Sequence, residues 1–380
     1  MREAARRHLP KAVFEFVDRG SERDLALAGN TAAFARLKLR QRVLVDLSRR
    51  DMGTDLFGKR IAMPVVIAPT GIAGLLWYQG ELALARAAAD AGIPFTLTAN
   101  SITSMETVAR QAAGRRWFQF YLWEEEDLAF QMVERAKGLG YEVLVVTVDT
   151  ALGRTREHND RNGFTDPISL NARFLLDMAL HPRWLAGVMG RYLTTTGMPR
   201  HENFPAQYRN RITRPTSKAP KNSTTTTWDV IGRIRGIWPG PLVVKGILTA
   251  DDARRAVDEG ADGVVVSNHG GRNMDSAVAS IDALPEIVNA VGARTTVLLD
   301  SGIRRGSDIV KALALGAKAV LIGRATLWGI AAGGQAGAER ALNLLRREYE
   351  QTLAYAGCRS AQDLDRDVLA SDQPLRGHTL

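Results

Sequence analysis

PLVVKGILTADDARRAVDEGADGVVVS, residues 241–267, holds two short β-branched runs with a helical pattern between them. The runs PLVVK (241–245) and GVVVS (263–267) are continuously apolar up to their last residue, which is typical of strands buried on both faces of a parallel sheet. Thr249, followed by two acidic residues, is a candidate helix N-cap, and Gly260 is a plausible helix end. The stretch therefore predicts a strand, helix and strand of a parallel sheet covered by helices.

The same kind of run recurs along the chain, mostly with amphipathic helical patterns between the runs. The eight runs are 65–68, 95–98, 117–121, 143–149, 241–245, 263–267, 296–300 and 319–323. Eight such units predict a TIM (β/α)₈ barrel, with a doubly wound sheet plus a second domain as the alternative. We expect residues 1–380 to form a single domain, in which helices in the first forty or so residues close one end of the barrel.

A long insertion, taken as residues 160–226, separates the fourth and fifth runs. Its first half, residues 171–193, is apolar with interspersed arginines and one tryptophan, whereas residues 198–227 are polar and are predicted to be mobile or disordered. A basic, aromatic-bearing apolar segment suits a membrane interface. A lid, or packing against another subunit, is the alternative.

The composition limits the class of protein without choosing a function. The net charge of +9 favours anionic ligands, nucleic acid or an anionic membrane surface. The single cysteine excludes an internal disulfide, and no Cys or His spacing resembles a zinc site, so no metal is expected. No secretory signal is evident, and prolines and glycines within the uncharged residues 61–80 favour a buried strand and loop over a membrane span. We therefore expect a cytoplasmic protein.

Polar residues and glycines gather where the predicted strands end, which is where the active site of such a barrel lies. These positions are Pro69, Thr70, Gly71, Thr98, Gln119, Tyr121, Thr147, Asp149, Lys245, Ser267, His269, Asp300, Gly323 and Arg324. A purely structural barrel would need no such groups there.

Two glycine–arginine segments follow the last two strands, DSGIRRG (300–306) and IGRA (322–325). Gly302 and Gly323 allow close approach of a ligand to the backbone, and Arg304 and Arg324 can hold a dianion. The pair of segments predicts a bound phosphate group, carried by a cofactor or by a substrate.

The stretch SNHGGRNMD (267–275) supplies candidate catalytic groups. His269 can act as a base near neutral pH if a carboxylate such as Asp149 holds its ring. Arg272 and Arg156 can bind a substrate carboxylate in bidentate fashion. Lys245 could form a Schiff base, pair with a carboxylate, or place positive charge beside a cofactor that becomes anionic.

Taken together, SNHGGRNMD, Lys245-Gly246, TVDT (147–150), FQFY (118–121) and DSGIRRGSDIVKALALGAKAVLIGR (300–324) resemble the FMN-dependent L-2-hydroxy-acid dehydrogenase/oxidase family. The similarity runs from residue 9 to about residue 360, outside the insertion, and is strongest to the (S)-mandelate dehydrogenase members. The resemblance implies FMN at the phosphate site and oxidation of an L-2-hydroxy acid to the 2-oxo acid.

The resemblance also implies a role for each site residue. Pro69, Thr70, Gly71, Thr98, Gln119 and Thr147 would line the flavin ring, with Ser267 also at the cofactor. Lys245 would place its charge near the ring, and Asp300 would hold the ribityl chain. The phosphate would lie on Gly302, Arg304, Gly323 and Arg324.

On the substrate side, His269 would be the base oriented by Asp149, Arg156 and Arg272 would bind the carboxylate, and Tyr121 the substrate oxygens. Abstraction of the Cα proton and removal of the hydroxyl proton with hydride transfer both fit these residues. The family further implies a homotetramer.

Three positions bear on the substrate and the electron acceptor. Phe16 stands where family members usually have a tyrosine that binds the substrate carboxylate. It either favours an apolar substrate side chain or serves packing only. Gly71, in place of the alanine of glycolate-oxidase-like members, and Trp77, in place of a histidine common in oxidases, resemble the dehydrogenases that reduce a membrane quinone.

The overall similarity of residues 9–16, 48–60, 68–77 and 323–332 to the mandelate dehydrogenases favours a mandelate-like aromatic substrate. Gly71 and Trp77 favour a quinone-type acceptor, and with it a peripheral location on the inner face of the cytoplasmic membrane. L-lactate as substrate, or O₂ as acceptor, is the nearest alternative. A barrel that binds a phosphorylated metabolite or nucleic acid without redox chemistry, and a flavin-binding interaction protein on a membrane, are the alternatives from other classes. Nucleic acid is not an expected partner.

Overall fold

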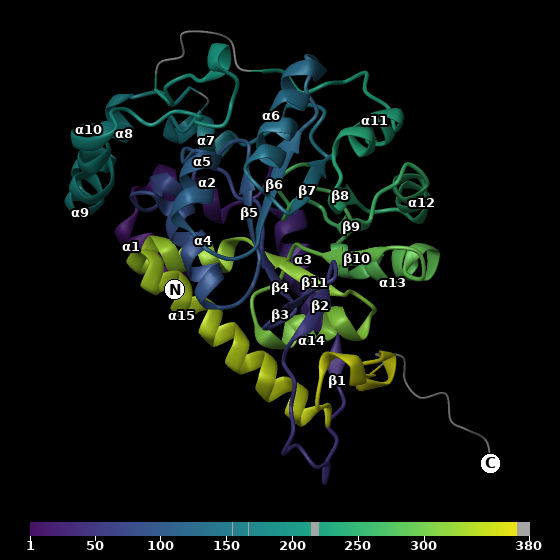
Figure 1. Ribbon diagram of the computed structural model, residues 1–380. Helices are drawn as coiled ribbons and strands as arrows, with labels where there is room; N and C mark the ends of the chain where they lie inside the picture. The colour runs from purple at the N-terminus through teal and green to yellow at the C-terminus, as the bar shows by residue number, and fades with distance from the viewer. Residues whose placement is uncertain (154, 166, 214–219, 371–380) are drawn as a thin grey trace.

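The computed structural model describes residues 1–153, 155–165, 167–213 and 220–370. Eight parallel strands close into a barrel in the order β10-β11-β4-β5-β6-β7-β8-β9, as predicted (Figure 1). Every predicted run contributes one strand, and the alternative of a doubly wound sheet is wrong. The barrel strands are β4 (Val65–Ile67), β5 (Phe95–Thr98), β6 (Arg116–Tyr121), β7 (Val143–Thr147), β8 (Leu242–Ile247), β9 (Gly263–Val266), β10 (Thr296–Leu299) and β11 (Ala319–Ile322).

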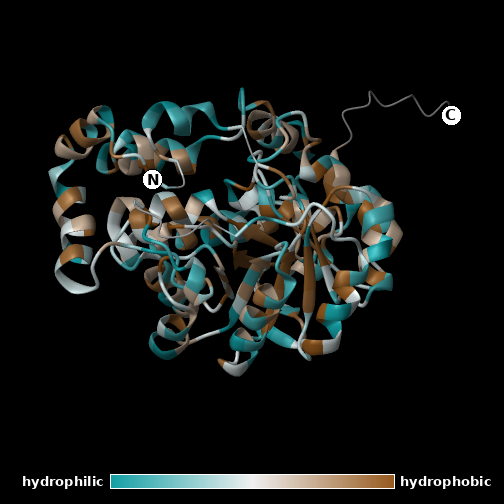
Figure 2. Cartoon of the chain, turned by 90° about the horizontal axis from the view of Figure 1, so that it is seen from above, coloured by the Kyte–Doolittle hydropathy of each residue, from teal (hydrophilic) through white to brown (hydrophobic). Residues whose placement is uncertain are grey.

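The strands are mostly apolar because they are buried on both faces, with polar exceptions such as Thr96 in β5, Gln119 in β6 and Lys245 in β8. In β4, Val66 points into the barrel core, whereas Val65 and Ile67 belong to the core between strands and helices. Figure 2 shows the central strands as the most hydrophobic part of the chain. This two-sided burial explains why the runs read as continuous rather than alternating.

Helices cover the outside of the barrel. They are α4 (Gly80–Asp90), α5 (Met105–Gln111), α6 (Glu126–Gly138), α11 (Asp229–Ile237), α12 (Ala250–Asp258), α13 (Ser280–Val291), α14 (Gly306–Ala314) and α15 (Arg324–Tyr355). The expected cap of α12 is present, because the Thr249 hydroxyl accepts from the Asp252 N–H at 3.2 Å. Short 3₁₀ turns lie at Ala73–Leu75, Ala206–Tyr208, Ala361–Asp363 and Arg366–Val368.

The two ends of the barrel differ. The hairpin of β2 (Thr54–Leu56) and β3 (Lys59–Ile61) packs on the end where the strands begin, and Phe57 of its turn meets Trp117 edge-on. The first forty residues form α1 (Arg2–His8), α2 (Lys11–Asp18) and α3 (Leu25–Arg36), and a small sheet pairs β1 (Lys38–Leu39) with β12 (Leu369–Ala370). Helix α2 lies at the opposite end, where the strands finish, because Arg324 after β11 donates to the Val17 carbonyl.

The insertion after β7 contains α7 (Glu157–Asn162), α8 (Ala172–Ala179), α9 (Pro182–Trp184), a π-helical turn (Leu185–Gly190) and α10 (Arg191–Thr195). It rests on the loop between β4 and α4. The Trp184 indole N–H donates to the Leu75 carbonyl at 2.7 Å, and the Tyr192 hydroxyl accepts from the Gln79 N–H at 3.0 Å.

The expected disorder of residues 198–227 stays a prediction. Residues 214–219 lie outside the described residues, while bridges join Arg200 to Arg211 and Trp123 to Asn222.

Over the residues that the structure describes, no helix is both long enough and apolar enough to cross a membrane. Residues 61–80, which lack charge, fold instead into part of β3, into β4 and into the loop that leads to α4.

Helix α15 folds back on itself at Gly333 and Gly334, which have non-helical backbone angles. A methyl group at Gly329 would lie 2.6 Å from the Gly337 carbonyl oxygen.

We expect Gly329→Ala to lower the free energy of unfolding by roughly 1–3 kcal/mol, since the backbone would have to move. Gly29→Ala is the control, because nothing lies within 4 Å of its added methyl. It should raise that energy by about 0.5–1 kcal/mol. Urea unfolding measures both, and equal effects would contradict the packing.

Candidate active site

A cavity opens where the barrel strands end, and most of the predicted site residues line it. They are Pro69, Thr70, Gly71, Gln119, Tyr121, Thr147, Arg156, Lys245, His269, Arg272, Asp300, Gly302, Arg304, Gly323 and Arg324. The other predicted residues, Thr98, Asp149 and Ser267, lie directly behind this lining. Thr98 accepts from the Asn100 N–H, while Asp149 and Ser267 contact His269.

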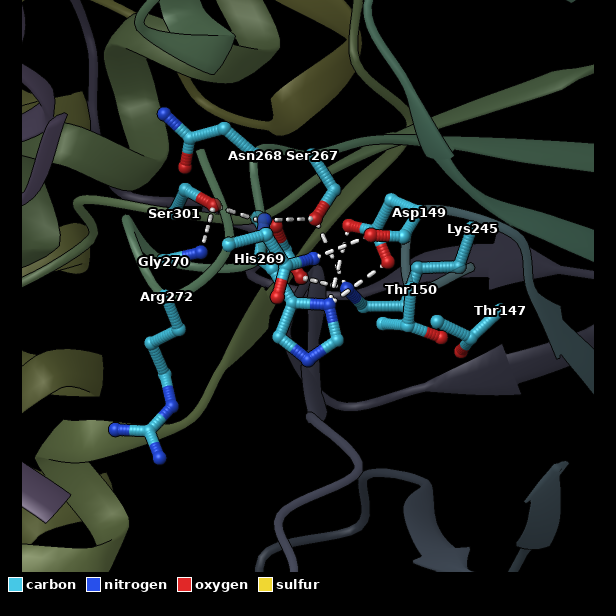
Figure 3. A network of polar contacts seen from close by, with 12 residues as sticks. Thr147, Asp149, Thr150, Lys245, Ser267, Asn268, His269, Gly270, Arg272 and Ser301 are labelled. Carbon is cyan, nitrogen blue, oxygen red and sulfur yellow. Dashed lines mark hydrogen bonds and ion pairs between the residues drawn. The ribbon is translucent and has the colours of Figure 1, made fainter. Parts of the chain in front are cut away.

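His269 and Asp149 form a hydrogen-bonded pair across two strand ends (Figure 3). The His269 Nδ1 lies 2.8 Å from Asp149 Oδ1 and 3.1 Å from Oδ2. Because an ionised carboxylate only accepts, Nδ1 carries the proton, and Nε2 is the ring nitrogen that can receive one. The pair therefore has the geometry of a histidine base oriented by a carboxylate.

The local backbone places the pair in this position. His269 has a positive φ of 58°, and its N–H donates to the Ser267 hydroxyl at 3.0 Å. Gly246 has a φ of 113°, and a Cβ there would lie 2.7 Å from the Asp149 Cβ. Glycine at position 246 therefore lets β8 pass close to Asp149, and the unusual His269 backbone is typical of a functional residue.

Lys245 is buried and bonded to the two strands that follow β8. Its ammonium lies 3.0 Å from Asp300 Oδ2 and donates to the Ser267 hydroxyl at 2.9 Å. Burial alone would lower the pKa of Lys245, but Asp300 and then Asp149 outweigh burial and raise the pKa above its ordinary value. A lysine held in its charged form is a poor amine nucleophile, so the geometry favours a fixed positive charge over a Schiff base.

Arg304 and Arg324 form a cationic end to the cavity. Arg324 donates to the carbonyls of Val17, Gly270 and Arg19 at 2.9–3.0 Å. Neither arginine forms an ion pair with a carboxylate among the described residues. Burial lowers the pKa of both guanidinium groups, and the charge of Arg304 lowers that of Arg324 further. Two desolvated cations without a counter-ion are suited to a dianion.

Arg272 and Arg156 flank the ring of Phe16. The Arg272 guanidinium carbon lies 4.9 Å from the ring centroid and that of Arg156 lies 6.0 Å from it. Arg272 also donates to the Phe16 carbonyl at 2.6 Å, and Arg156 donates to the Arg272 carbonyl at 3.0 Å. The two cations thus meet at one side of the cavity, as the sequence predicted for groups that bind one carboxylate.

Ser301 and Asn100 are further residues of the cavity that the sequence analysis did not select. The Ser301 hydroxyl accepts from the Gly270 N–H and donates to Asp300 Oδ1, both at 2.8 Å, and its φ is 74°. Its place directly after Asp300 in DSGIRRG was the available signal. A serine in a turn is too common for that signal to single it out.

Comparison with known proteins agrees with this geometry. The family profile described as FMN-dependent dehydrogenase matches residues 5–371. The chain belongs to the FMN-dependent dehydrogenase family. Its cofactor is FMN, and the alternative of a barrel without redox chemistry is excluded.

Individual relatives carry several names. The chain is 42% identical to (S)-mandelate dehydrogenase of Pseudomonas putida, over 98% of this chain and 93% of that protein. It is 40% identical to an L-lactate oxidase of a Nostoc species, over 97% of this chain and 96% of that protein. A crystal structure of monotopic membrane protein (S)-mandelate dehydrogenase matches with a TM-score of 0.89, over 97% of each chain.

The described residues fit FMN at three places. Arg304 and Arg324, with Gly302 and Gly323, would hold the phosphate. The Gln119 side-chain oxygen is buried in the cavity wall and has no hydrogen-bond partner among the described residues, so it can accept from a flavin N–H. Lys245 would place its charge beside the ring, and Asp300, which pairs with Lys245 at 3.0 Å, would hold the ribityl hydroxyls.

We expect Arg304→Gln to weaken FMN binding by about 10- to 150-fold, the equivalent of one charge-assisted hydrogen bond. Fluorescence titration of the apoprotein measures this loss. Riboflavin, which lacks the phosphate, is the matched ligand and should bind the variant and the parent protein equally. An equal loss for both ligands would show that Arg304 does not act on the phosphate.

Proposed function

We propose that this protein oxidises an L-2-hydroxy acid with an aromatic side chain, of the mandelate type, to the 2-oxo acid. The observation that carries the proposal is the pairing of His269 with Asp149 in a cavity that also holds Arg156 and Arg272. A base and a carboxylate-binding pair in one cavity suit a substrate that has both a carboxylate and a secondary alcohol (H–C–OH) to oxidise. Bound FMN supplies the acceptor for the two electrons that the substrate loses.

The protein groups then have separate tasks. Arg272 and Arg156 fix the substrate carboxylate, and the Tyr121 hydroxyl reaches the substrate oxygens from the end of β6. His269 takes one proton at Nε2, from Cα or from the hydroxyl, and Asp149 stabilises the imidazolium that results. The fixed charge of Lys245 stabilises negative charge that develops at the cofactor.

An aromatic wall supports the choice of substrate. The Phe16 ring lies 4.9 Å from that of Phe164, and Phe164 lies 6.2 Å from Phe174. Phe16 lines the cavity beside both substrate arginines, where a phenyl group of the substrate can pack. L-lactate is the second candidate, because lactate enzymes are also among the relatives at about 40% identity.

A quinone-type acceptor is the second part of the proposal. Among the relatives, dehydrogenases and oxidases have similar identity to this chain, so the likeness alone does not choose between quinone and O₂. A methyl group at Gly71 would lie 3.6 Å from the Asn100 Cβ, which is an ordinary contact. The alanine of glycolate-oxidase-like members would therefore also fit, and sterics within the protein do not choose the acceptor. Parallel assays with a quinone analogue and with O₂ test the acceptor, and faster turnover with O₂ would refute the quinone.

The insertion is proposed to bind the inner face of the cytoplasmic membrane. Leu176, Leu180 and Leu193 have exposed fractions of 63%, 71% and 57%. Figure 2 shows hydrophobic residues on the helices at the left of the view, where α8 to α10 lie in Figure 1. Exposed leucines with nearby arginines suit an interface of lipid tails and anionic headgroups.

We also propose a homotetramer, which light scattering of the purified protein tests.

We expect His269→Gln to lower kcat by about 10²- to 10⁴-fold, the usual contribution of a positioned base. Flavin content should not change, because His269 does not contribute to the phosphate end. Stopped-flow reduction of the flavin by (S)-mandelate measures the step, and the visible spectrum gives the flavin content. Unchanged turnover would remove His269 from the role of base.

Phe16→Tyr tests the substrate preference. The added hydroxyl lies beside Arg272 and can bond a carboxylate, so kcat/KM for L-lactate should rise by about 2- to 12-fold, the equivalent of one neutral hydrogen bond. The preference for mandelate over lactate should fall, since the wall becomes more polar. Steady-state assays of both acids with a dye acceptor measure the ratio. An unchanged ratio would leave Phe16 a packing residue.

The membrane proposal predicts that Leu176→Glu with Leu180→Glu abolishes most vesicle binding, because two anchors become charged. The control changes two exposed leucines on other helices, Leu25→Glu with Leu344→Glu, whose exposed fractions are 59% and 43%. It adds the same charge and should retain more binding. Co-sedimentation with anionic vesicles measures both, and equal loss would refute docking through α8.

A further inference from the structure

A second polar pocket lies outside the active site and is lined by residues of α2, α7 and α8 and by Arg19. Figure 1 labels these three helices in its upper left part. Its volume is about 160 Å³. A single water needs only roughly 10–15 Å³ of such space, so the pocket has room for an ion of several heavy atoms. Lys11 reaches it from α2 and Arg19 from the residue that follows α2, while Arg161 lies on α7 and Arg173 on α8.

The charges in this pocket do not balance. Lys11 pairs with Glu15 at 3.7 Å, and Arg19 pairs with Asp24 at 2.9 Å. Glu15 is the one carboxylate among the pocket residues that the structure describes, and it also accepts from the Asn162 amide. Arg161 and Arg173 form no ion pair with any described residue. The pocket therefore has an excess of positive charge that a dianion would neutralise.

His158 gives an independent indication of a ligand. Its side chain lines the pocket and only 3% of the residue is exposed. The Nε2 atom is buried and has no hydrogen-bond partner among the described residues. Buried polar atoms are normally paired, so an unpaired ring nitrogen in a cationic pocket points to a missing ligand atom.

We infer that this pocket binds a phosphate group through Arg161, Arg173 and His158. Guanidinium groups bind phosphate oxygens in bidentate fashion. His158 and Arg161 approach from α7, Arg173 from α8, and Lys11 of α2 lines the third side. Donors on three sides suit a tetrahedral oxyanion better than a planar carboxylate. The phosphate belongs to a small soluble anion or to the headgroup of an anionic lipid. Arg173 precedes the exposed Leu175 and Leu176 on α8, which places the pocket at the edge of the proposed membrane face.

Calorimetric titration of the FMN-loaded enzyme with inorganic phosphate at low ionic strength tests the site. Bound FMN occupies the Arg304 and Arg324 end, so that end does not contribute to the signal. We expect saturable binding at one site. Arg161→Gln with Arg173→Gln should weaken it by about tenfold or more, since two charge-assisted contacts are lost. His158→Gln, which retains a polar side chain, should weaken it less.

The matched control is Arg255→Gln with Arg346→Gln, two exposed arginines that form no ion pair with described residues. It removes the same charge and should leave phosphate affinity within about twofold of the parent, because long-range charge effects are screened. Flavin absorbance, Tm and turnover of mandelate check that each variant is folded. Equal weakening in both double variants, or no saturable phosphate binding by the parent enzyme, overturns the proposal.

Vesicles distinguish the two sources of the phosphate. The probe is a phosphatidylcholine vesicle that contains phosphatidylglycerol. If the pocket binds a lipid headgroup, the Arg161/Arg173 variant should co-sediment less with these vesicles than the control does. Inorganic phosphate should then also compete with the vesicles for the parent enzyme. A soluble ligand predicts equal co-sedimentation of the two variants, with the calorimetric difference retained. This test is independent of the substrate, because neither double variant touches the active-site cavity.

Discussion

Buried charges at one end of a closed apolar cylinder govern the rest of this structure. Lys245, held by Asp300 and Ser267, joins the ends of β8, β9 and β10, and the bond from His269 to Asp149 joins β9 to β7. A buried ion pair offsets its desolvation cost only when its geometry is good and its remaining polar atoms are hydrogen-bonded. Lys245 has both Asp300 and Ser267 as partners, so its charge is held in place and can act on a reaction without first reorganising.

The fold was predictable because one pattern, a short apolar run followed in most cases by an amphipathic helical pattern, recurs eight times. Each of the eight strands is short and mostly apolar, because a parallel strand covered on both faces has few positions where a polar side chain can be satisfied. Polar residues at the strand ends then stand out, which is why His269, Lys245 and Arg324 could be selected from the sequence. The resemblance to a known family added the cofactor and the individual roles.

Other features could not be predicted, for identifiable reasons. The buried contacts of Arg324 with the carbonyls of Val17, Gly270 and Arg19 depend on a long-range approach of α2 to the end of the barrel. No local pattern encodes that approach. The placement of the insertion depends on single contacts such as Trp184 with Leu75, and Ser301 is indistinguishable in sequence from an ordinary turn residue. The roles of the site residues remain predictions that the proposed experiments test.

Backbone carbonyls at the end of α2 bind the side chains of two arginines, Arg272 and Arg324, that have different proposed roles. The carbonyls of Phe16 and Arg19 accept from Arg272, which is proposed to bind the substrate. Those of Val17 and Arg19 accept from Arg324, which is proposed to bind the cofactor phosphate. Ordering this one segment therefore prepares both sites together. Linkage then requires reciprocity: if FMN tightens the binding of a hydroxy acid by some factor, the acid tightens the retention of FMN by the same factor.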